Sequence, residues 1–471
     1  MSQATFHHIP EVLKQFNWTP QPAAQRLVTE QVDAFLKRCP DAAQLAHRMK
    51  DQTGTRFIDW IDFITIPRSA DIRERLAETG FISQPQPQAE HCYIHPGAIF
   101  PGIVLGESSN LQVGIKVESV MDFLTAMHIP GGATELHGEP LGQFRMARAF
   151  KGEDADLLAV ERHGWRGFVA PRFDALKAVQ AQQHLERFCL RTRTFDDDAD
   201  GFIQTNRLVD AAIADLGPDW TCDLFFNAER RYWMQRNRAA QVQHGRQQRL
   251  GLGWANHDHH TYRSSREHFP RLVALLEKLG FVCRERFYAG HEAQWGAQVM
   301  EHHVTGITTF NDVDMNGEEL LGDFSHEGFK QSRDRLGTVG LWCGLHGEAI
   351  LQAGMHHLEA MFDWAALVEQ LEGRNIRTMH PFTTFPYLKQ AFTEGEPWGV
   401  DETRVDRLLD RGQITHDQAE TFMRDGAIGS HLENLERNDG FKGFNQQGVS
   451  DIISRTDPRK QRVGKLHGVG A

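Results

Sequence analysis

One local pattern recurs along this chain and constrains its fold more than any other feature. The pattern is a β-rich segment, a helix with an apolar stripe, and several short strand candidates. Its clearest copy has a predicted strand at residues 257–264 and a helix whose apolar side chains recur at helical spacing from Phe269 to Leu279, ended by Gly280-Phe281. An earlier copy has a predicted strand at residues 57–67 and a helix at residues 72–81, which ends in a second Gly-Phe pair.

Two further copies of the pattern are less regular. One has a predicted strand at residues 113–117 and a short predicted helix at residues 121–127. The other begins at Met355 and contains an apolar helical stripe from Trp364 to Leu371. Both are followed by further strand candidates, so the chain contains four β-α-strand-rich units, and such recurrence indicates internal repetition.

Changes in composition and in hydrophobic pattern along the sequence predict four segments. The stretch at residues 230–249 looks like an exposed helix or a connector, and we place the main domain boundary there. The segments are a helical cap (1–50), an N-terminal domain of two units (51–175), a polar, Arg- and Gln-rich helical connector (176–250) and a C-terminal domain of two units (251–460).

Composition excludes several classes of function. The 471 residues carry a formal net charge of -12 and no long basic cluster, so we expect no nucleic-acid partner. No uncharged apolar stretch approaches the length of about 18 residues that predicts a membrane span. The first residues lack the basic and apolar regions of a signal peptide, and the six cysteines are scattered without a CxxC pair. We therefore expect a cytoplasmic protein without a cysteine-zinc site, and homo-oligomers are common enough to expect one.

Three short stretches contain residues that could bind a metal ion. The first is Asn256-His-Asp-His-His260, in which His257 and His259 would share one face of a strand while His260 lies on the other. In the second, His356 and His357 would point to opposite faces, and in the third, Glu433 and Glu436 differ in the same way. Alternation alone leaves the choice within each stretch open. Two histidines and one carboxylate on separate strands would form the facial triad that holds Fe(II).

In order and spacing, these stretches resemble the catalytic half of 4-hydroxyphenylpyruvate dioxygenase, a family within the vicinal oxygen chelate superfamily. The matching motifs are Asp258-His259 followed by a helix that ends in Gly-Phe, Gly354-x-x-His357, and Glu433-x-x-x-Arg437 followed by Gly443-Phe444. The resemblance covers about residues 250–460. The N-terminal half resembles the family only in its pattern of elements.

The resemblance implies a fold, a metal and a reaction. The fold is α+β, with repeated βαβββ modules forming two incompletely closed sheet barrels. The implied Fe(II) ligands are His259, His357 and Glu433. Arg437 could position the Glu433 carboxylate or be a surface charge, and Phe444 could wall the pocket or fill the core; we take the first role for each. The implied reaction is the oxidative decarboxylation of a 2-oxo acid by O2. The first strand of the N-terminal domain has Asp62 where the C-terminal domain has His259, so we expect a structural repeat without metal there.

Some positions depart from the family pattern and weaken the assignment of a substrate. His356 stands where the family has a glutamine, Asn445 replaces the last glycine of its Gly-Phe-Gly turn, and residues 312–319 lack its Pro-x-Asn-Glu-Pro-like loop. We therefore do not assign hydroxyphenylpyruvate. A close variant is the group of 2-oxoadipate dioxygenase/decarboxylases, which use the same ligand types, although their motifs are not clear here.

Two other hypotheses use the same scaffold. Vicinal oxygen chelate proteins include isomerases and epimerases, which would use another divalent metal and would need a general base, for which Glu301, His302 and His303 are candidates. A non-catalytic protein that binds a small molecule on the concave sheet would need no metal.

Overall fold

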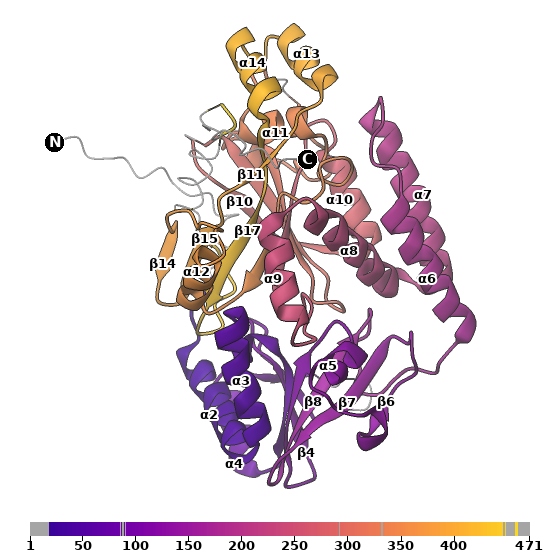
Figure 1. Ribbon diagram of the computed structural model, residues 1–471, viewed down its shortest axis with the longest axis vertical. Coiled ribbons are helices and arrows are strands. Elements are labelled where there is room, and N and C mark those ends of the chain that lie inside the picture. Colours follow the sequence, from indigo (N-terminus) through magenta and orange to yellow (C-terminus); the bar gives the residue numbers. More distant parts are fainter. Residues whose placement is uncertain are drawn as a thin grey trace, which may run out of the picture.

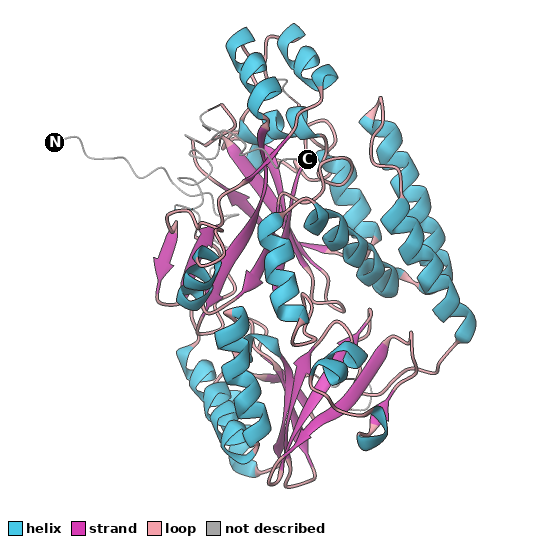
Figure 2. Cartoon of the chain, in the orientation of Figure 1, coloured by secondary structure: helices cyan, strands magenta, loops and turns pink. Residues whose placement is uncertain are grey.

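The chain folds into two β-sheets, one in each half, with helices packed around and between them (Figures 1 and 2). This computed structural model describes residues 18–84, 86, 89, 91–291, 293–330, 333–445, 448 and 457–459. In the view of Figure 1, the N-terminal half lies below the C-terminal half.

The N-terminal half is built from two consecutive βαβββ units. Its elements are β1 (Ile61–Pro67), α4 (Ala70–Glu78), β2 (Ile82–Ser83), β3 (Cys92–Ile94), β4 (Gly102–Gly106), β5 (Leu111–Lys116), α5 (Val120–Ala126), β6 (Leu136–His137), β7 (Phe144–Lys151) and β8 (Ala155–Arg162). The strand order is β2-β3-β4-β1-β5-β8-β7-β6. The two units meet where β1 and β5 pair antiparallel.

The C-terminal half repeats this arrangement with longer insertions. Its elements are β9 (His257–Arg263), α10 (Phe269–Lys278), β10 (Val282–Tyr288), β11 (Trp295–Glu301), β12 (Thr308–Asp314), α11 (Thr338–His346), β13 (His357–Met361), α12 (Trp364–Glu372), β14 (Thr383–Phe385), β15 (Leu388–Phe392), β16 (Glu396–Trp398), α13 (Glu402–Asp410), α14 (His416–Asp425) and β17 (Ala427–Arg437). The strand order is β10-β11-β12-β9-β13-β17-β15-β14, with β16 on the side of β17.

Both sheets therefore follow one plan, in which a central antiparallel pair is flanked on each side by a parallel partner. In the N-terminal half these pairs are β4-β1 and β5-β8, and in the C-terminal half they are β12-β9 and β13-β17. Among the strands that the structure describes, the two end strands of each sheet do not pair with each other, so neither sheet closes. The predicted α+β fold of repeated βαβββ modules in two incompletely closed barrels is confirmed.

The two Gly-Phe pairs noted in the sequence occupy equivalent positions. Gly80 and Gly280 follow their helices with φ of 86° and 98°, a conformation that favours glycine. A Cβ on either would come within 2.8 Å of a histidine Nε2, that of His95 or of His302. In each half the phenylalanine ring lies 5.4 Å from the ring of that histidine. The Gly-Phe pair thus allows a histidine ring to pack against the end of the helix in both repeats.

Helices cover both halves and fill the junction between them. The elements are α2 (Pro22–Arg38), α3 (Pro40–Thr53), α6 (Ala175–Leu190), α7 (Asp198–Leu216), α8 (Pro218–Gln235) and α9 (Arg238–Gln248), with short 3₁₀ turns at Phe57–Trp60, Gly131–Ala133 and Glu319–Leu321. Of the two interpretations of residues 230–249, the exposed helix is wrong. Gln243 and Arg246 of α9 are buried and donate hydrogen bonds to backbone carbonyls at the end of α3, because α9 lies between the halves. Its polar sequence thus reflects hydrogen bonding within the junction.

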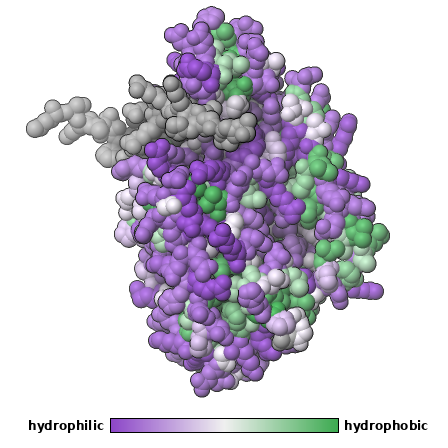
Figure 3. Space-filling view, in the orientation of Figure 1, coloured by the Kyte–Doolittle hydropathy of each residue, from purple (hydrophilic) through white to green (hydrophobic). Residues whose placement is uncertain are grey.

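Each half has its own large apolar core, and the exterior is mostly hydrophilic. One core joins α2, α3 and the N-terminal sheet, and the other joins α6–α10 and the C-terminal sheet. Figure 3 shows hydrophobic atoms gathered on the side where α6 and α7 lie, where Leu176 and Leu190 are exposed. Within the described ranges, no helix has both the length and the apolar character needed to cross a bilayer.

A buried ion cluster ties the connector helices to the C-terminal half. Glu229 of α8 is 1% exposed, and its Oε1 lies 2.9 Å from Arg191 Nη2 and 2.6 Å from Arg193 Nη2. The two arginines also donate to the carbonyls of Ile350 and Leu351, in the segment before β13. Loss of the carboxylate would leave two guanidinium groups buried without their counter-charge.

We predict that Glu229→Ala lowers the free energy of unfolding by about 3–5 kcal/mol, because removing one partner of a buried ion pair leaves an uncompensated charge. Glu30→Ala, which removes an exposed pair with Arg75, should cost less than about 1 kcal/mol and serves as the control. Urea unfolding followed by circular dichroism measures both. Equal midpoints for the two variants would contradict a structural role for the buried cluster.

Candidate metal centre

Strand register brings three ionisable side chains into one row across the C-terminal sheet. Glu359 of β13 lies opposite His259 of β9 and beside Glu433 of β17. His357 precedes Glu359 by two residues, so both side chains point to the same face of β13. All four residues are buried, with between 1% and 7% of each exposed.

The four side chains converge on one small volume. His259 Nε2 lies 2.5 Å from Glu359 Oε1, and His357 Nε2 lies 3.2 Å from the same oxygen. His357 Nε2 is also 3.5 Å from Glu433 Oε2. One ligand atom from each of the four residues lies within 4.8 Å of the others. We call these four residues the His/Glu cluster.

The structure brings together the three residues expected as ligands and places a fourth ionisable side chain, that of Glu359, beside them. Glu359 was not singled out, although the same alternation that turns His357 inward also turns the residue two positions later inward. The residues left as alternatives lie elsewhere. His260 packs on Phe226 of α8, His356 Nδ1 lies 3.0 Å from a backbone carbonyl of β17, and Glu436 accepts hydrogen bonds from Lys389 and from the first turn of α12.

Asp258 and Arg437 hold His259 in place through hydrogen bonds on the Nδ1 side of its ring. Asp258 Oδ2 lies 2.8 Å from His259 Nδ1, and Arg437 donates to both carboxylate oxygens of Asp258, at 2.9 and 3.1 Å. Burial would raise the pKa of Asp258, but Arg437 and the hydrogen bond with His259 hold it well below its usual range. A carboxylate on Nδ1 leaves Nε2 free to bind a metal ion.

Arg437 does not contact Glu433, contrary to the role expected for it. Residues four apart on a strand are separated by about 13 Å, so the guanidinium reaches the start of β9 instead. It also donates to the carbonyls of Phe441 and Gly443, and thereby fixes the turn that presents Phe444 to the site. Arg437 thus fixes both Asp258, the partner of His259, and the turn that carries Phe444.

Aromatic rings close the volume around the cluster. The ring of Phe444 lies 5.2 Å from that of His259 and 5.0 Å from that of Phe310, and the ring of Phe392 lies 5.0 Å from that of His357. We call Phe310, Phe392 and Phe444 the aromatic wall. The placement of Phe444 beside His259 agrees with the wall position expected for it.

The charges of the cluster suit a divalent cation. Burial lowers the pKa of both His259 and His357, so each imidazole is neutral, the form that binds a metal ion. Burial raises the pKa of Glu433 to about 7, and burial and the neighbouring Glu433 raise that of Glu359 well above its usual value. Glu359 Oε2 has no hydrogen-bond partner among the described residues. Two buried carboxylates beside two neutral imidazoles lack a cation, and a metal ion fits this need.

Further along the same face of β9 lies a buried arginine. Arg263 is 2% exposed, and its closest carboxylate is that of Asp312 on β12, at 3.6 Å. Burial raises the pKa of Asp312 to about 7 despite the guanidinium. Arg263 Nε, Asp312 Oδ1 and the hydroxyl of Thr261 have no hydrogen-bond partner among the described residues. This part of the concave face thus retains polar groups that a bound molecule could satisfy.

The N-terminal half has counterparts of Asp258, Arg437 and Phe444 but lacks counterparts of the residues in the His/Glu cluster. Arg162 donates to Asp62 at 2.9 Å, and the ring of Phe168 lies 4.9 Å from that of Phe63, as Phe444 lies beside His259. The register makes Asp62 the equivalent of Asp258, with a bulge at the same point of both central strand pairs. The positions of His259, Glu359 and Glu433 are occupied by Phe63, Gly114 and Leu158. The expectation that Asp62 replaces His259 is therefore wrong by one residue.

The bases considered for an isomerase do not lie at the cluster. Glu301 pairs with Lys442 at 3.0 Å, and His303 is exposed at the end of β11. The ring of His302 packs on Phe281.

No protein-family model matches the sequence, and a search of curated proteins found no match. Similar solved structures include a 4-hydroxymandelate synthase variant from Streptomyces coelicolor, with a TM-score of 0.28 and 11% identity over 73% of this chain and 97% of that one. Methylmalonyl-CoA epimerase from Mycobacterium tuberculosis gives 0.23 and 8%, over 39% and 88% of the two chains. A xylose isomerase-like TIM barrel/4-hydroxyphenylpyruvate dioxygenase fusion gives 0.23 and 10%, over 88% and 56%.

The dioxygenase that the sequence motifs resemble is thus among the similar structures. TM-scores below 0.5 carry no argument about activity, so the assignment of fold class rests on the strand order and register of this chain. Those features, and not a neighbour, define the two pairs of βαβββ modules.

Proposed function

We propose that this chain is a non-haem iron dioxygenase that uses Fe(II) and O2 for the oxidative decarboxylation of a 2-oxo acid. The observation that carries the proposal is the meeting of the His259 and His357 imidazoles with the Glu433 carboxylate on one buried face. Each comes from a different strand. Two histidines and one carboxylate arranged in this way are the ligand set of non-haem Fe(II) oxygenases, which leaves positions open for substrate and O2.

In this proposal the protein positions the metal and protects the site. Nε2 of each histidine and the Glu433 carboxylate would hold the iron, which supplies the redox chemistry when bound. Asp258 keeps the His259 proton on Nδ1, and Gln390 donates to Glu433 Oε1 at 2.9 Å and fixes that carboxylate. The aromatic wall excludes bulk water from the same volume.

Arg263 supports a more specific substrate class, a 2-oxo acid with a second acidic group. It lies four residues after His259 on the same face, about 13 Å along the strand. A substrate bound at the cluster through its 2-oxo acid end would direct its other end toward the guanidinium. Because Asp312 has a raised pKa, Arg263 retains charge for an incoming carboxylate, which arginine binds well.

Glu359 favours a second candidate function, an isomerase or epimerase that uses another divalent metal. If Glu359 also bound the metal, the ion would have four protein ligands, and fewer of its coordination positions would remain for substrate and O2 together. If Glu359 instead stays off the metal, its carboxylate lies where a general base for proton transfer would be needed. The two candidates differ in metal preference and in consumption of O2.

We predict that anaerobically purified protein binds about one iron per chain and that Glu433→Gln loses it, because one of the proposed anionic ligands is gone. Glu436→Gln makes the same chemical change on the opposite face of β17 and should keep the iron. Elemental analysis of the three proteins after reconstitution with Fe(II) measures this. Stoichiometric zinc or nickel without O2 uptake would favour the isomerase, and no metal in any of them would contradict both candidates.

We predict that Arg263→Gln raises KM for dicarboxylic 2-oxo acids by about tenfold or more, because a charge-assisted hydrogen bond is worth about 1.5–3 kcal/mol. KM for monocarboxylic 2-oxo acids and the iron content should change little. O2 uptake measures KM, and Arg271→Gln, an exposed position on α10, is the matched control. An equal rise in KM for both substrate types would remove Arg263 from substrate selection.

A further inference from the structure

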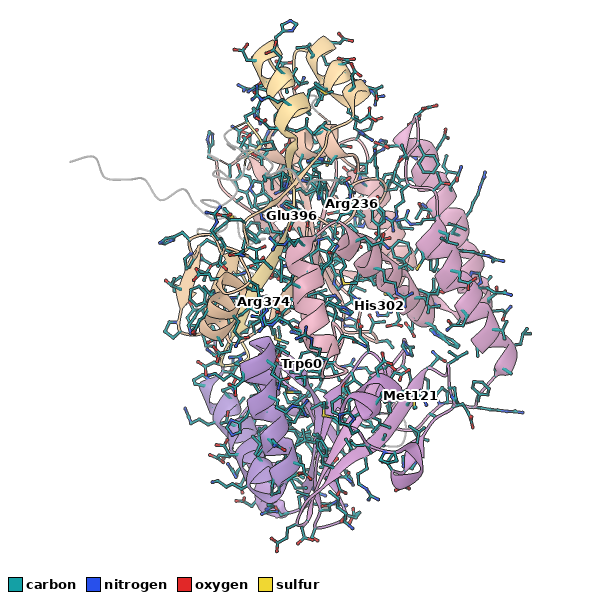
Figure 4. All side chains as sticks on the ribbon, in the orientation of Figure 1. Trp60, Met121, Arg236, His302, Arg374 and Glu396 are labelled. Carbon is teal, nitrogen blue, oxygen red and sulfur yellow. The ribbon has the colours of Figure 1, made fainter. Side chains whose placement is uncertain are left out.

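A large cavity lies at the junction of the two halves, apart from the His/Glu cluster. Its volume is about 810 Å³, and none of the four cluster residues lines it. Figure 4 labels one of its lining residues, His302, at the level where the halves meet. Lining side chains with a charge or an imidazole come from both halves and include Lys116, Arg162, Arg166, Arg230, His257 and His302.

The carboxylates that line this cavity already have cationic partners. The pairs, each with its shortest distance, are Asp59–Arg56 (2.6 Å), Asp62–Arg162 (2.9 Å), Glu118–Arg230 (3.9 Å), Asp223–His163 (2.9 Å) and Glu301–Lys442 (3.0 Å). By contrast, Lys116 and Arg166, which also line the cavity, have no carboxylate within 4.0 Å in the described ranges of the chain. The wall of the cavity therefore has an excess of positive charge.

Neutral groups at the cavity also lack partners. Trp254 is 2% exposed, and its indole N–H, which can only donate, has no hydrogen-bond acceptor among the described residues. His257 lines the cavity with Nδ1 unpartnered, and Asn227 does so with Oδ1 unpartnered. These three atoms are themselves buried, so the groups that a ligand in the cavity would meet directly are the charged side chains of its wall.

We propose that this cavity is a second ligand site that binds a small anionic molecule with a carboxylate or phosphate group. Its volume falls within the range of about 300–1,000 Å³ that is usual for small-molecule pockets. The chain as a whole carries a net charge of -12 and would repel anions, so local excess positive charge is needed to hold one. Lys116 and Arg166 provide it.

The site is independent of the proposed function, although Arg437 connects the two regions. Arg437 lines the cavity and also holds Asp258, the partner of His259. A bound anion would therefore lie next to the support of the cluster without touching its ligand atoms.

Isothermal titration of the full-length protein with inorganic phosphate, and separately with succinate, tests this site. We expect saturable binding of at least one probe, weakened about tenfold or more in the double variant Lys116→Gln/Arg166→Gln. The control Lys151→Gln/Arg172→Gln removes the same charge from exposed positions of the same half and should bind as the wild type does. Binding of phosphate alone would identify a phosphorylated ligand, and binding of succinate alone a carboxylate.

Glu433→Gln should retain full probe binding even though it loses the metal, which separates this site from the cluster. Loss of binding in that variant would place the probes at the metal and overturn the proposal. The absence of saturable binding of both probes, or an equal loss in the double variant and its control, would also overturn it.

Discussion

Two glutamates buried side by side, Glu359 and Glu433, set the main electrostatic constraint on this structure. They lie on neighbouring strands, face the same way, and have no arginine or lysine within 4.0 Å in the described part of the chain. Burying such charges without compensation is costly, so they must take up protons or share a cation. The neutral imidazoles of His259 and His357 complete a set of atoms that suits a metal ion. Burial raises the pKa of Glu433, and burial together with the neighbouring Glu433 raises that of Glu359, so without a metal the carboxylates tend to take up protons.

The surrounding structure holds this arrangement in place. Asp258 and Arg437 orient His259, and the turn held by Arg437 delivers Phe444 to the wall. The N-terminal half preserves this support in Asp62, Arg162 and Phe168 but places Phe63 where the first ligand would be. The carboxylate–arginine–phenylalanine arrangement therefore joins the two modules of each half and is present with or without the cluster of possible metal ligands. A metal centre needs only a few inward positions to be changed on this scaffold.

Much of this could be predicted from the sequence because strand alternation and the repeated Gly-Phe pairs are local signals. They predicted the modules, whereas the family resemblance implied His259, His357 and Glu433, which the structure brings close together. Glu359 was missed because the family resemblance implies only three ligands, although the alternation of β13 turns Glu359 to the same face as His357. The partner of Arg437 was missed because β13 lies between β17 and β9, so the contact between Arg437 and Asp258 depends on the register of the whole sheet. The burial of α9 was missed because its polar side chains bond to the backbone of α3, a contact that no local pattern shows.

The most direct test of the central claim is an anomalous difference map at the iron edge from crystals of the protein loaded anaerobically with Fe(II). The account predicts a peak within bonding distance of His259 Nε2, His357 Nε2 and the Glu433 carboxylate. The distance of that peak from Glu359 would decide between three and four protein ligands, and so between the two candidate functions. A map without a peak at these residues, from crystals that contain iron elsewhere, would contradict the claim that the His/Glu cluster is a metal centre.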